Sequence, residues 1–537
     1  MRNAGKLVNV PAGSITRMSR RGFLGIVTTA GVLAAFPAVA TGATRAIRDF
    51  GAVGDGVTDD SAAIRNAVSQ LRSGDTLRFP PGKYRFAQRN PPGGAAMTIA
   101  GLSNITIEFD PGAELLMDNL ASDGAGTSHG IVVRGPASRI TLRGVVVRWK
   151  TQPALRSMGD GIRIVGFPST STRVPSGWTG SKGPASFVSL LKCAVFSSPQ
   201  AGVIMMGVAD ITVTGLRITN TMADGLHFNA CRRGQVTDYV ATNPGDDGLA
   251  LVTYYSPTGG YDNAAQTFSI SQLTDWSDAD FTISGVTVTG GHANGVRLAG
   301  VNRSSLTGVT VRNVQGGAGV VFDSASPGAG AGWQYVASRG VRLDQITIEN
   351  SQTGLQVLAR PNGSTGDKFS RFGIDVSGLT VRNSPRWSAI IESLGAAASG
   401  VQIRDCTVTA GQIASGTGIF GLQKTQGVVL GTIAITTPAP VVAFSGDNSG
   451  QINANQIRVT VTGPAVSSAG PVIQFQGSDG TVTTAEANWT AAPLSWTPVV
   501  IVGRTGSTCS PTNHPVKIGT LRVVPTNLAR PREIRCP

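Results

Sequence analysis

The chain of 537 residues has few cysteines, few aromatic residues and few charges, and these scarcities exclude several classes of protein. Charged residues make up 14%, with little Glu or Lys, so long charged helices are disfavoured. The 41% hydrophobic content is too high for a disordered chain, and the 70 glycines show no triplet period, which excludes collagen. Five cysteines are too scattered for a disulfide scaffold and lack metal-ligand spacing: Cys193, Cys231, Cys406, Cys509 and Cys536. Only Cys509 and Cys536 are placed to close the C-terminal tail.

Long hydrophobic runs are also missing, except near the N-terminus. There SRRGFL at residues 19–24, an apolar stretch at 26–36 and AVA at 38–40 form the pattern of a twin-arginine signal peptide with its cleavage site. A membrane anchor fits less well because the stretch is short and ends at Pro37. We expect residues 1–40 to direct secretion, leaving an extracellular or cell-envelope protein without stable membrane insertion.

The charge balance is basic. Removing the five cationic residues of the signal peptide lowers the formal net charge from +14 to +9. A positive secreted protein suits acidic polymers or anionic envelopes, although general solubility explains the surplus equally well. No nucleic-acid-binding motif is present, so no nucleic-acid partner is expected.

What the chain does contain is a short repeat that alternates apolar and polar residues. Its clear copies begin at residues 211, 234, 281, 304, 341, 374 and 401, and weaker copies begin at residues 140 and 188. The starts at 188, 211 and 234 are evenly spaced, the interval from 234 to 281 is close to two such spacings, and the later, wider intervals leave room for loop insertions. A β-sandwich would give turn signals but no such period. The repeat therefore predicts an all-β fold, a single-stranded right-handed parallel β-helix whose coils stack at about 4.8 Å.

Asparagine and glycine recur at fixed positions of this repeat. We interpret the asparagines as a turn ladder, because Asn tolerates the left-handed conformation, and the central glycines as tight turns. The asparagines are Asn220, Asn243, Asn313, Asn350 and Asn383, and the glycines are Gly215, Gly285, Gly308 and Gly378.

A first resemblance to a known family lies before the repeats. DFGAVGDGVTDDSAAI at 49–64 with FPPGKY at 79–84 resembles the entry segment of the pectate-lyase-like β-helix superfamily, especially its polygalacturonase-related branch. The resemblance implies that the amphipathic stretch 61–71 is an α-helix capping the N-terminal end of the solenoid. We interpret Asp55, Asp59 and Asp60 as structural, with Asp59 or Asp60 capping that helix, rather than as catalysts.

Two consecutive repeats carry acids at one offset. Asp224 and Asp247 stand at the same distance from their repeat starts, and the same offset gives Asn294 and Ala201 in other repeats. Stacking in register would place Asp224 beside Asp247, with Asp246 adjacent, and crowded carboxylates raise each other's pKa. By spacing alone, Asp-Gly turn chemistry or a structural Ca²⁺ site accounts for the pattern equally well.

The acids carry the second resemblance. NTMADG at 220–225 with GDDG at 245–248 resembles the polygalacturonase family, glycoside hydrolase family 28, and the stretch 246–256 also resembles the related dextranases. The resemblance implies that Asp246 is the general acid and that Asp224 and Asp247 activate water. It also implies inversion at the anomeric carbon, for which acid and base stand about 6.5–9.5 Å apart. No cofactor and no metal are expected.

The family's substrate motifs are only partly present. Its Gly-His-Gly corresponds to 291–295, which contains His292, while its Arg-Ile-Lys clamp is absent and the aligned segment 319–323 is apolar and acidic. A neutral glycan, or a uronate held in another way, is therefore expected. The predicted substrate-binding residues are His292, His227, Asn294, Tyr254, Tyr255 and Arg297.

Insertions and aromatic residues near the acids suggest a cleft. Loops at about 165–187 and 257–280 are expected to form its walls, and Trp149 and Trp276 are further candidates for sugar stacking. Trp333 and Trp387 are expected to pack in the core or in loops.

The sequence thus predicts a secreted, monomeric, inverting glycoside hydrolase whose partner is a polysaccharide or cell-envelope glycan. Residues 41–430 would form the catalytic β-helix, and 431–537 the final coils and a C-terminal β extension. One alternative is a polysaccharide lyase or uronan epimerase, with Arg163, Arg217 or Arg297 neutralising a uronate carboxyl. The other is a non-catalytic glycan-binding envelope protein whose acids bind Ca²⁺ or nothing.

Overall fold

The computed structural model describes residues 42–168, 174–178, 183–363, 366–504 and 515–536. Over these residues the chain is all-β, with one α-helix, α1 (Ser61–Ser69), and three short 3₁₀ helices, η1 (Ile47–Phe50), η2 (Pro92–Gly94) and η3 (Gly366–Phe369). None of the helices described is long and apolar enough to cross a membrane. The expected signal peptide, residues 1–40, lies outside the described residues.

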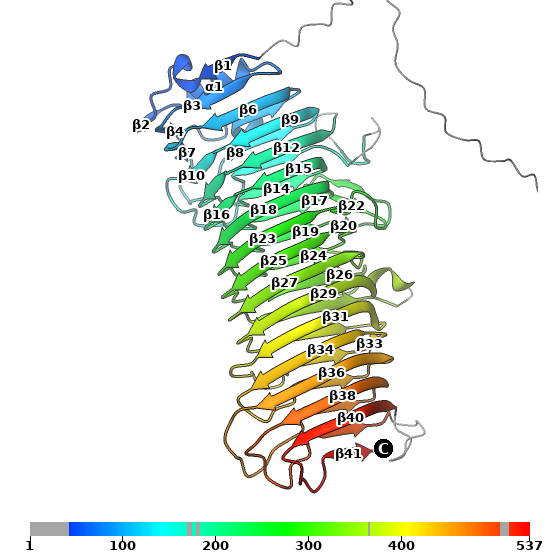
Figure 1. Cartoon of the computed structure of the whole chain (residues 1–537). Helices are drawn as coiled ribbons and strands as arrows, with labels where there is room; N and C mark the ends of the chain where they lie inside the picture. The colour runs from blue at the N-terminus through cyan, green and yellow to red at the C-terminus, as the bar shows by residue number, and fades with distance from the viewer. Residues whose placement is uncertain (1–41, 169–173, 179–182, 364–365, 505–514, 537) are drawn as a thin grey trace, which may run out of the picture. The chain divides into compact units, whose positions relative to one another are not determined.

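Two long parallel sheets form the body of residues 42–536 (Figure 1). Most of their strands pair with strands one coil earlier and one coil later, so the chain winds as a stack of coils. The first sheet contains β5 (Ala95–Ala100), β8 (His129–Arg134), β11 (Ile162–Val165), β14 (Val203–Met206), β17 (Leu226–Asn229), β19 (Leu249–Val252), β24 (Val296–Ala299), β26 (Ala318–Ala325), β28 (Thr353–Arg360), β30 (Ala389–Ser393), β32 (Phe420–Gln423), β35 (Phe444–Asp447), β37 (Ile473–Gln476), β39 (Val499–Val502) and β41 (Arg532–Arg535).

The second sheet contains β1 (Thr44–Ala46), β2 (Asp55–Asp59), β3 (Thr76–Phe79), β4 (Gly82–Phe86), β6 (Ser103–Phe109), β7 (Ala113–Met117), β9 (Ala137–Arg143), β10 (Val146–Trp149), β12 (Ala185–Leu191), β13 (Ala194–Phe196), β15 (Val208–Thr214), β16 (Arg217–Thr219), β18 (Arg232–Thr242), β23 (Thr282–Thr289), β25 (Ser305–Arg312), β27 (Val341–Glu349), β29 (Arg371–Arg382), β31 (Ala398–Thr409), β33 (Thr425–Gln426), β34 (Val429–Thr437), β36 (Ile452–Val461), β38 (Gly480–Asn488) and β40 (Val516–Val524). A small third sheet contains β20 (Tyr254–Tyr255), β21 (Gly260–Asp262) and β22 (Thr267–Ile270).

The strand register confirms most of the predicted repeat. Val188 pairs with Ile211 and Ile211 with Gly234, as the even spacing of these three starts predicted. The interpretation of the interval from 234 to 281 as two repeats is wrong, because β18 pairs directly with β23 and Gln235 lies opposite Thr282. One coil spans this interval, and its extra residues leave the stack to form the small third sheet. The later, wider intervals between repeat starts are also single coils.

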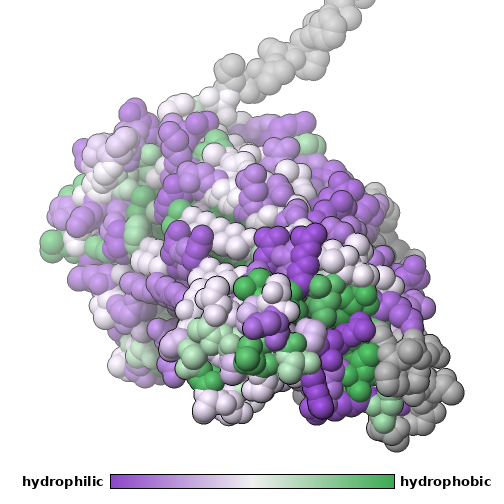
Figure 2. Space-filling model, turned by 60° about the horizontal axis from the view of Figure 1, so that its bottom comes forward, coloured by the Kyte–Doolittle hydropathy of each residue, from purple (hydrophilic) through white to green (hydrophobic). Residues whose placement is uncertain are grey.

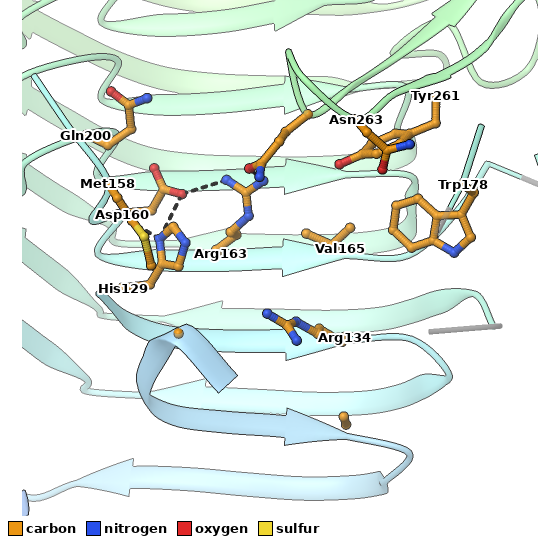
Figure 3. A pocket seen from close by; sticks show the side chains of 13 residues that line it. His129, Arg134, Met158, Asp160, Arg163, Val165, Trp178, Gln200, Tyr261 and Asn263 are labelled. Atoms are coloured by element: carbon orange, nitrogen blue, oxygen red, sulfur yellow. Dashed lines mark hydrogen bonds and ion pairs between the residues drawn. The ribbon is translucent and has the colours of Figure 1, made fainter. Parts of the chain in front are cut away.

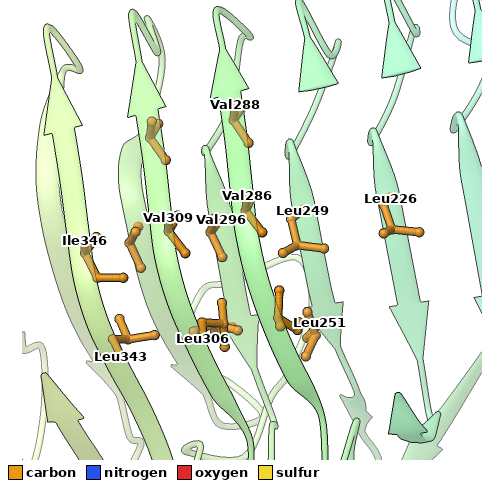
Figure 4. Close-up of a cluster of buried hydrophobic side chains, with 14 of the residues drawn as sticks. Leu226, Leu249, Leu251, Val286, Val288, Val296, Leu306, Val309, Leu343 and Ile346 are labelled. Carbon is orange, nitrogen blue, oxygen red and sulfur yellow. The ribbon is translucent and has the colours of Figure 1, made fainter. Parts of the chain in front are cut away.

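The core lies between the two long sheets. Alternation along each strand turns Val, Ile and Leu inward, and Figure 4 shows Leu226, Leu249 and Val296 on successive strands of the first sheet and Val286 and Val309 on successive strands of the second. These five side chains are at most 1% exposed. Burying one such side chain contributes about 1.5–3 kcal/mol, so the repeated apolar positions hold the coils together.

The turn columns confirm the interpretation of the asparagines and glycines. The five ladder asparagines all have positive φ angles, between 49° and 59°, and the four repeat-centre glycines have φ angles between 60° and 68°. Neighbouring asparagine side chains also bond between coils: Asn350 Nδ2 donates to Asn313 Oδ1 at 3.3 Å and Asn383 Nδ2 to Asn350 Oδ1 at 3.2 Å.

Helix α1 lies against the first coils, near β5 and η1, with Ile64 and Ala67 buried (Figure 1). Asp60 occupies its N-cap position without a capping bond and instead accepts the Val53 and Gly54 N–H groups. Asp59 accepts the Ser61 N–H at 3.1 Å. The structural interpretation of these acids is thus supported, but the predicted capping bond from Asp60 is absent.

Beyond residue 430 the parallel pairing continues through β34, β36, β38 and β40. Cys536 is disulfide-bonded, while Cys509, its expected partner, lies outside the described residues. Figure 2 turns this end of the stack forward, and hydrophobic residues show there among hydrophilic ones. Leu494, for example, is 58% exposed.

Candidate active site

The acids occupy one column at the start of the first-sheet strands. Leu226 pairs with Leu249 and Leu249 with Val296, so the residues two positions earlier, Asp224, Asp247 and Asn294, stack in successive coils. The predicted in-register placement is therefore observed. Asp160 belongs to the same column further toward the N-terminus, because Ile162 pairs with Val203 and Val203 with Leu226.

The column brings the carboxylates together. One oxygen from each of Asp224, Asp246 and Asp247 lies within 4.8 Å of the others, and the Asp247 N–H donates to Asp224 Oδ1 at 3.0 Å. Asp224 and Asp247 are buried, whereas the Asp246 side chain is 31% exposed. These nearest oxygens lie closer than the about 6.5–9.5 Å between acid and base in most inverting glycosidases, so the geometry gives no support to inversion.

Asp224 is held ionised by its neighbours. Burial alone would raise its pKa, but the contact with His227, whose Nδ1 is 2.6 Å from Asp224 Oδ2, and the Asp247 N–H lower the pKa below its usual value. Burial works against the charged form of His227, yet Asp224 raises the pKa of that imidazole. His227, predicted as a substrate contact, is itself buried and bonded to the acid.

Asp247 has the opposite electrostatic environment. Burial and the charge of Asp224 raise the pKa of Asp247 to about 7. Its Oδ1 accepts the Asn294 side-chain amide at 2.8 Å and the Asn294 backbone N–H at 3.2 Å, while Arg297 lies 3.8 Å from Oδ2. Near neutral pH this carboxyl is therefore partly protonated, and Asn294 fixes its position.

Asp246 is the accessible member of the cluster. Burial and the neighbouring Asp224 raise its pKa, although Arg156 opposes the rise through a 2.6 Å contact from Nη1 to Asp246 Oδ2. Arg156 also donates to Gln200 at 2.9 Å. Sequence reasoning missed Arg156, because it lies 90 residues before Asp246 and belongs to no motif.

Arg297 connects the acids to a second charged group. Its Nη2 bonds Asp323 Oδ2 at 2.7 Å and lies 3.2 Å from the Tyr335 hydroxyl, and Arg360 bonds the other oxygen of Asp323 at 2.5 Å. Arg297 is therefore engaged on several sides and orients Asp247. Asp323 lies in segment 319–323, which aligns with the Arg-Ile-Lys clamp of the polygalacturonases. Its partner Arg360 belongs to no motif that the sequence would have revealed.

Aromatic residues border the acids on the C-terminal side. The Tyr254 ring lies 4.9 Å from Trp333 and 5.6 Å from Tyr335. Trp333 packs on Tyr254 as a loop residue, as expected, yet it is 47% exposed and so also offers an open ring surface. The predicted stacking roles of Trp149 and Trp276 are wrong, because these side chains are 2% and 9% exposed.

Two predicted residues lie apart from the acids. His292 lines a neighbouring hollow with Asn220, Thr221 and Gly245, and among the described residues it makes no hydrogen bond to the three carboxylates. Tyr255 packs edge-on against Phe369 at 5.0 Å. Both remain candidates for contact with a long glycan only.

A larger cavity of about 610 Å³ lies on the N-terminal side of the acids (Figure 3). Described residues of the two predicted loops form one wall: the Tyr261 N–H donates to Ser176 O at 2.8 Å, and the Trp178 ring lies 4.8 Å from the Tyr261 ring. Gln200 lines the cavity and accepts from Arg156, so the cavity and the acids are contiguous.

The floor of this cavity is a closed ionic group. Arg163 Nη1 lies 2.9 Å and His129 Nδ1 3.2 Å from Asp160 Oδ2, and Arg163 also donates to Gln266 at 2.8 Å. Burial alone would raise the pKa of Asp160, but His129 and Arg163 reverse this and hold the pKa well below its usual value. Asp160 is therefore an ionised structural anchor.

The three acids offer oxygens close enough together for a cation such as Ca²⁺. His227, Arg156 and Arg297 already contact these carboxylates. Protein cations thus supply much of the neutralising charge, and the arrangement suits proton transfer and water activation.

A known family matches the N-terminal part of the described chain, including the entry segment. Residues 44–130 match the sequence model of the family described as rhamnogalacturonase A/epimerase, pectate lyase-like. The match confirms the resemblance stated for residues 49–84, and it ends before the acids.

Curated relatives match over short segments. Mannuronan C5-epimerase AlgE6 of Azotobacter vinelandii is 33% identical over 99 residues, 18% of this chain and 9% of the relative. Mannuronan C5-epimerase AlgE4 of the same organism is 32% identical over 78 residues, 13% of this chain and 14% of the relative. The chain thus spans a small part of these relatives.

Solved structures are similar over longer stretches at low identity. The catalytic unit of a thermostable GH87 alpha-1,3-glucanase from Streptomyces thermodiastaticus is 15% identical, with a TM-score of 0.38 over 89% of this chain and 68% of that one. A family 28 exopolygalacturonase from Yersinia enterocolitica is 12% identical, with a TM-score of 0.34 over 90% and 78%.

Proposed function

We propose that the protein is a glycoside hydrolase that cleaves a polysaccharide. The observation that carries the proposal is the contrast within one carboxylate cluster: an accessible Asp246 with a raised pKa beside an Asp224 with a lowered one. Environments that push neighbouring carboxyl pKa values apart provide an acid and a base at the same pH.

In this mechanism Asp246 donates its proton to the glycosidic oxygen as the bond to the anomeric carbon breaks. Asp224, kept anionic by His227, takes the proton of a water molecule as that water attacks the carbon, and Asp247, positioned by Asn294, helps to orient the water. Arg156 is half exposed, and we expect an entering glycan to separate it from Asp246, which removes the interaction that favours the carboxylate.

The decisive variant is Asp246→Asn. We expect it to lower the release of reducing ends from the responsive glycan by about 10²–10⁴-fold, because the amide cannot donate the proton. The measurement is a reducing-sugar assay of the full chain against plant, microbial and envelope glycans.

Asp405→Asn is the matched control, because Asp405 is an exposed carboxylate on a strand of the second sheet. Wild-type rates in Asp246→Asn would rule out the assigned proton donor. Proton NMR of the first products then shows whether the released anomer is retained or inverted.

A second candidate is uronan epimerisation or lysis, favoured by the matches to mannuronan C5-epimerases. Of the three arginines named for it, Arg217 is paired with Asp238 on the second sheet and Arg297 with Asp323. Of these three arginines, Arg163 is the one that lines the large cavity. An unsaturated product that absorbs in the ultraviolet, or a changed C5 configuration by NMR without new reducing ends, would replace hydrolysis with this function.

The third candidate, a glycan-binding envelope protein, would show calcium-dependent melting without turnover.

We also propose that residues 1–40 direct secretion, that 41–430 form the catalytic domain and 431–537 its final coils and C-terminal extension. The proposal includes a right-handed coil, closed at its N-terminal end by α1, and a monomeric protein.

A further inference from the structure

The large cavity contains a cation that the site described above does not use. Arg134 ends β8, is exposed, and lines the cavity with its guanidinium. Within the described ranges its one hydrogen bond goes from Nη2 to the Gly93 carbonyl oxygen at 3.1 Å, and no carboxylate there pairs with it. In Figure 3 the dashed lines join His129, Asp160 and Arg163, and Arg134 stands apart from them.

The remaining lining also favours an anion. Among the described residues that line the cavity are two guanidinium groups, Arg134 and Arg163, and one carboxylate, Asp160, which Arg163 and His129 already hold. A guanidinium with free N–H groups binds planar anions in a fixed fork geometry. The formal charge of the chain without residues 1–40, which is +9, also favours acidic polymers over neutral ones.

The wall of the cavity suits a sugar ring. Trp178 and Tyr261 line it, and Trp178 is supported from behind by Phe268, whose ring is stacked 5.4 Å away. Flat aromatic surfaces of this kind bind the apolar faces of sugar rings. The column position of Asp160 lies two coils before Asp224, or about 10 Å along the stack, so a chain occupying the cavity extends naturally to the acids.

We propose that this cavity is a subsite for an acidic sugar residue, whose carboxylate or sulfate group pairs with Arg134. The inference rests on the proposed function, because one polysaccharide occupies both the cavity and the acids. It assigns the substrate class, an acidic polysaccharide, and places the anion-binding group on the N-terminal side of the carboxylates. The absent Arg-Ile-Lys motif is then no obstacle to an acidic substrate.

The test measures binding by isothermal titration calorimetry in the full chain carrying Asp246→Asn, so that probes are not consumed. The probes are oligogalacturonate, oligomannuronate, their carboxyl-reduced neutral counterparts and sulfated dextran oligosaccharides. We expect Arg134→Gln to weaken binding of an acidic probe at least 10-fold, Arg134→Lys to weaken it less, and the neutral counterparts to be unaffected. Whether the uronates or the sulfated probe respond identifies the anion.

Arg530→Gln is the matched control, since Arg530 is exposed near the C-terminus and lies outside both sites. The inference is overturned if no acidic probe binds, if Arg134→Gln binds acidic probes as tightly as the parent, or if it weakens neutral and acidic probes equally. Failure of the hydrolase proposal gives a different result from failure of the subsite. Arg134-dependent binding with no turnover by the wild-type chain supports the subsite and rejects the hydrolase. Turnover of a neutral glycan that Arg134→Gln leaves unchanged rejects the subsite alone.

Discussion

At the scale of single residues, buried carboxyl groups determine how the protein responds to pH. Burial raises the pKa of Asp278, which lies outside the three-acid cluster, to about 7. The pKa of Asp247 is raised to about 7 as well, by burial together with the charge of Asp224. The Asp278 oxygens accept the Cys231 N–H at 2.9 Å and the Thr253 hydroxyl at 3.0 Å. Between about pH 4 and pH 7 the folded protein retains a proton that the unfolded chain loses, so Asp278 destabilises the fold progressively as pH rises through this window.

Asp278→Asn removes this pH-dependent term. We expect the variant to gain stability relative to wild type between pH 5 and pH 8, on the order of 2 kcal/mol, measured from urea unfolding midpoints at both pH values. Asp280→Asn is the control, because Asp280 is an exposed acid paired with Arg303. A stability difference between Asp278→Asn and wild type that stays constant from pH 5 to pH 8 would contradict the assignment.

At the scale of elements, the turns between strands were more predictable than the side-chain contacts of the site. The asparagine column was visible in the sequence because a left-handed residue recurs at one repeat position, and the φ angles confirm it. Repeat spacing also placed Asp224 beside Asp247. Arg156 and Asp323 had no such signal, because Arg156 reaches Asp246 from a distant segment and Asp323 acts through its contact with Arg297. Side-chain direction there depends on packing that spacing does not encode.

The asparagine column can be tested at Asn350. Asn350→Ala and Asn350→Gly both remove the side-chain bonds to Asn313 and Asn383, but only alanine is strained at the φ angle of 52°. We expect the alanine variant to be less stable than the glycine variant by about 1 kcal/mol. Chemical denaturation of both proteins measures the difference. Identical midpoints would show that the left-handed backbone conformation does not destabilise the alanine variant.

At the scale of the whole solenoid, each coil is stabilised by its neighbours in the stack. The interval from Gly234 to Phe281 shows what sequence periodicity cannot resolve: an insertion about as long as one extra repeat looks like an added coil until the pairing of β18 with β23 is known. In a stack of this kind, stability is a sum of nearest-neighbour terms, and the ends open before the middle.

This arrangement predicts a gradient of local opening. Strand β40 pairs only with β38 among the described strands, and most of its residues are partly or fully exposed, whereas β25 is paired on both sides. We expect backbone amides of β40 to exchange with deuterium faster than those of β25, measured by mass spectrometry of proteolytic fragments. Equal protection of the two strands would indicate that the coils open together.

The insertion between β18 and β23 has a consequence for redesign. It carries Tyr261 and Gln266 to the large cavity, yet the coil resumes its register at Thr282 as though nothing had been added. The segment after β19 is therefore a graft site. Exchanging it for a segment of different length would replace that wall of the cavity, while the column of Asp224, Asp247 and Asn294 keeps its place.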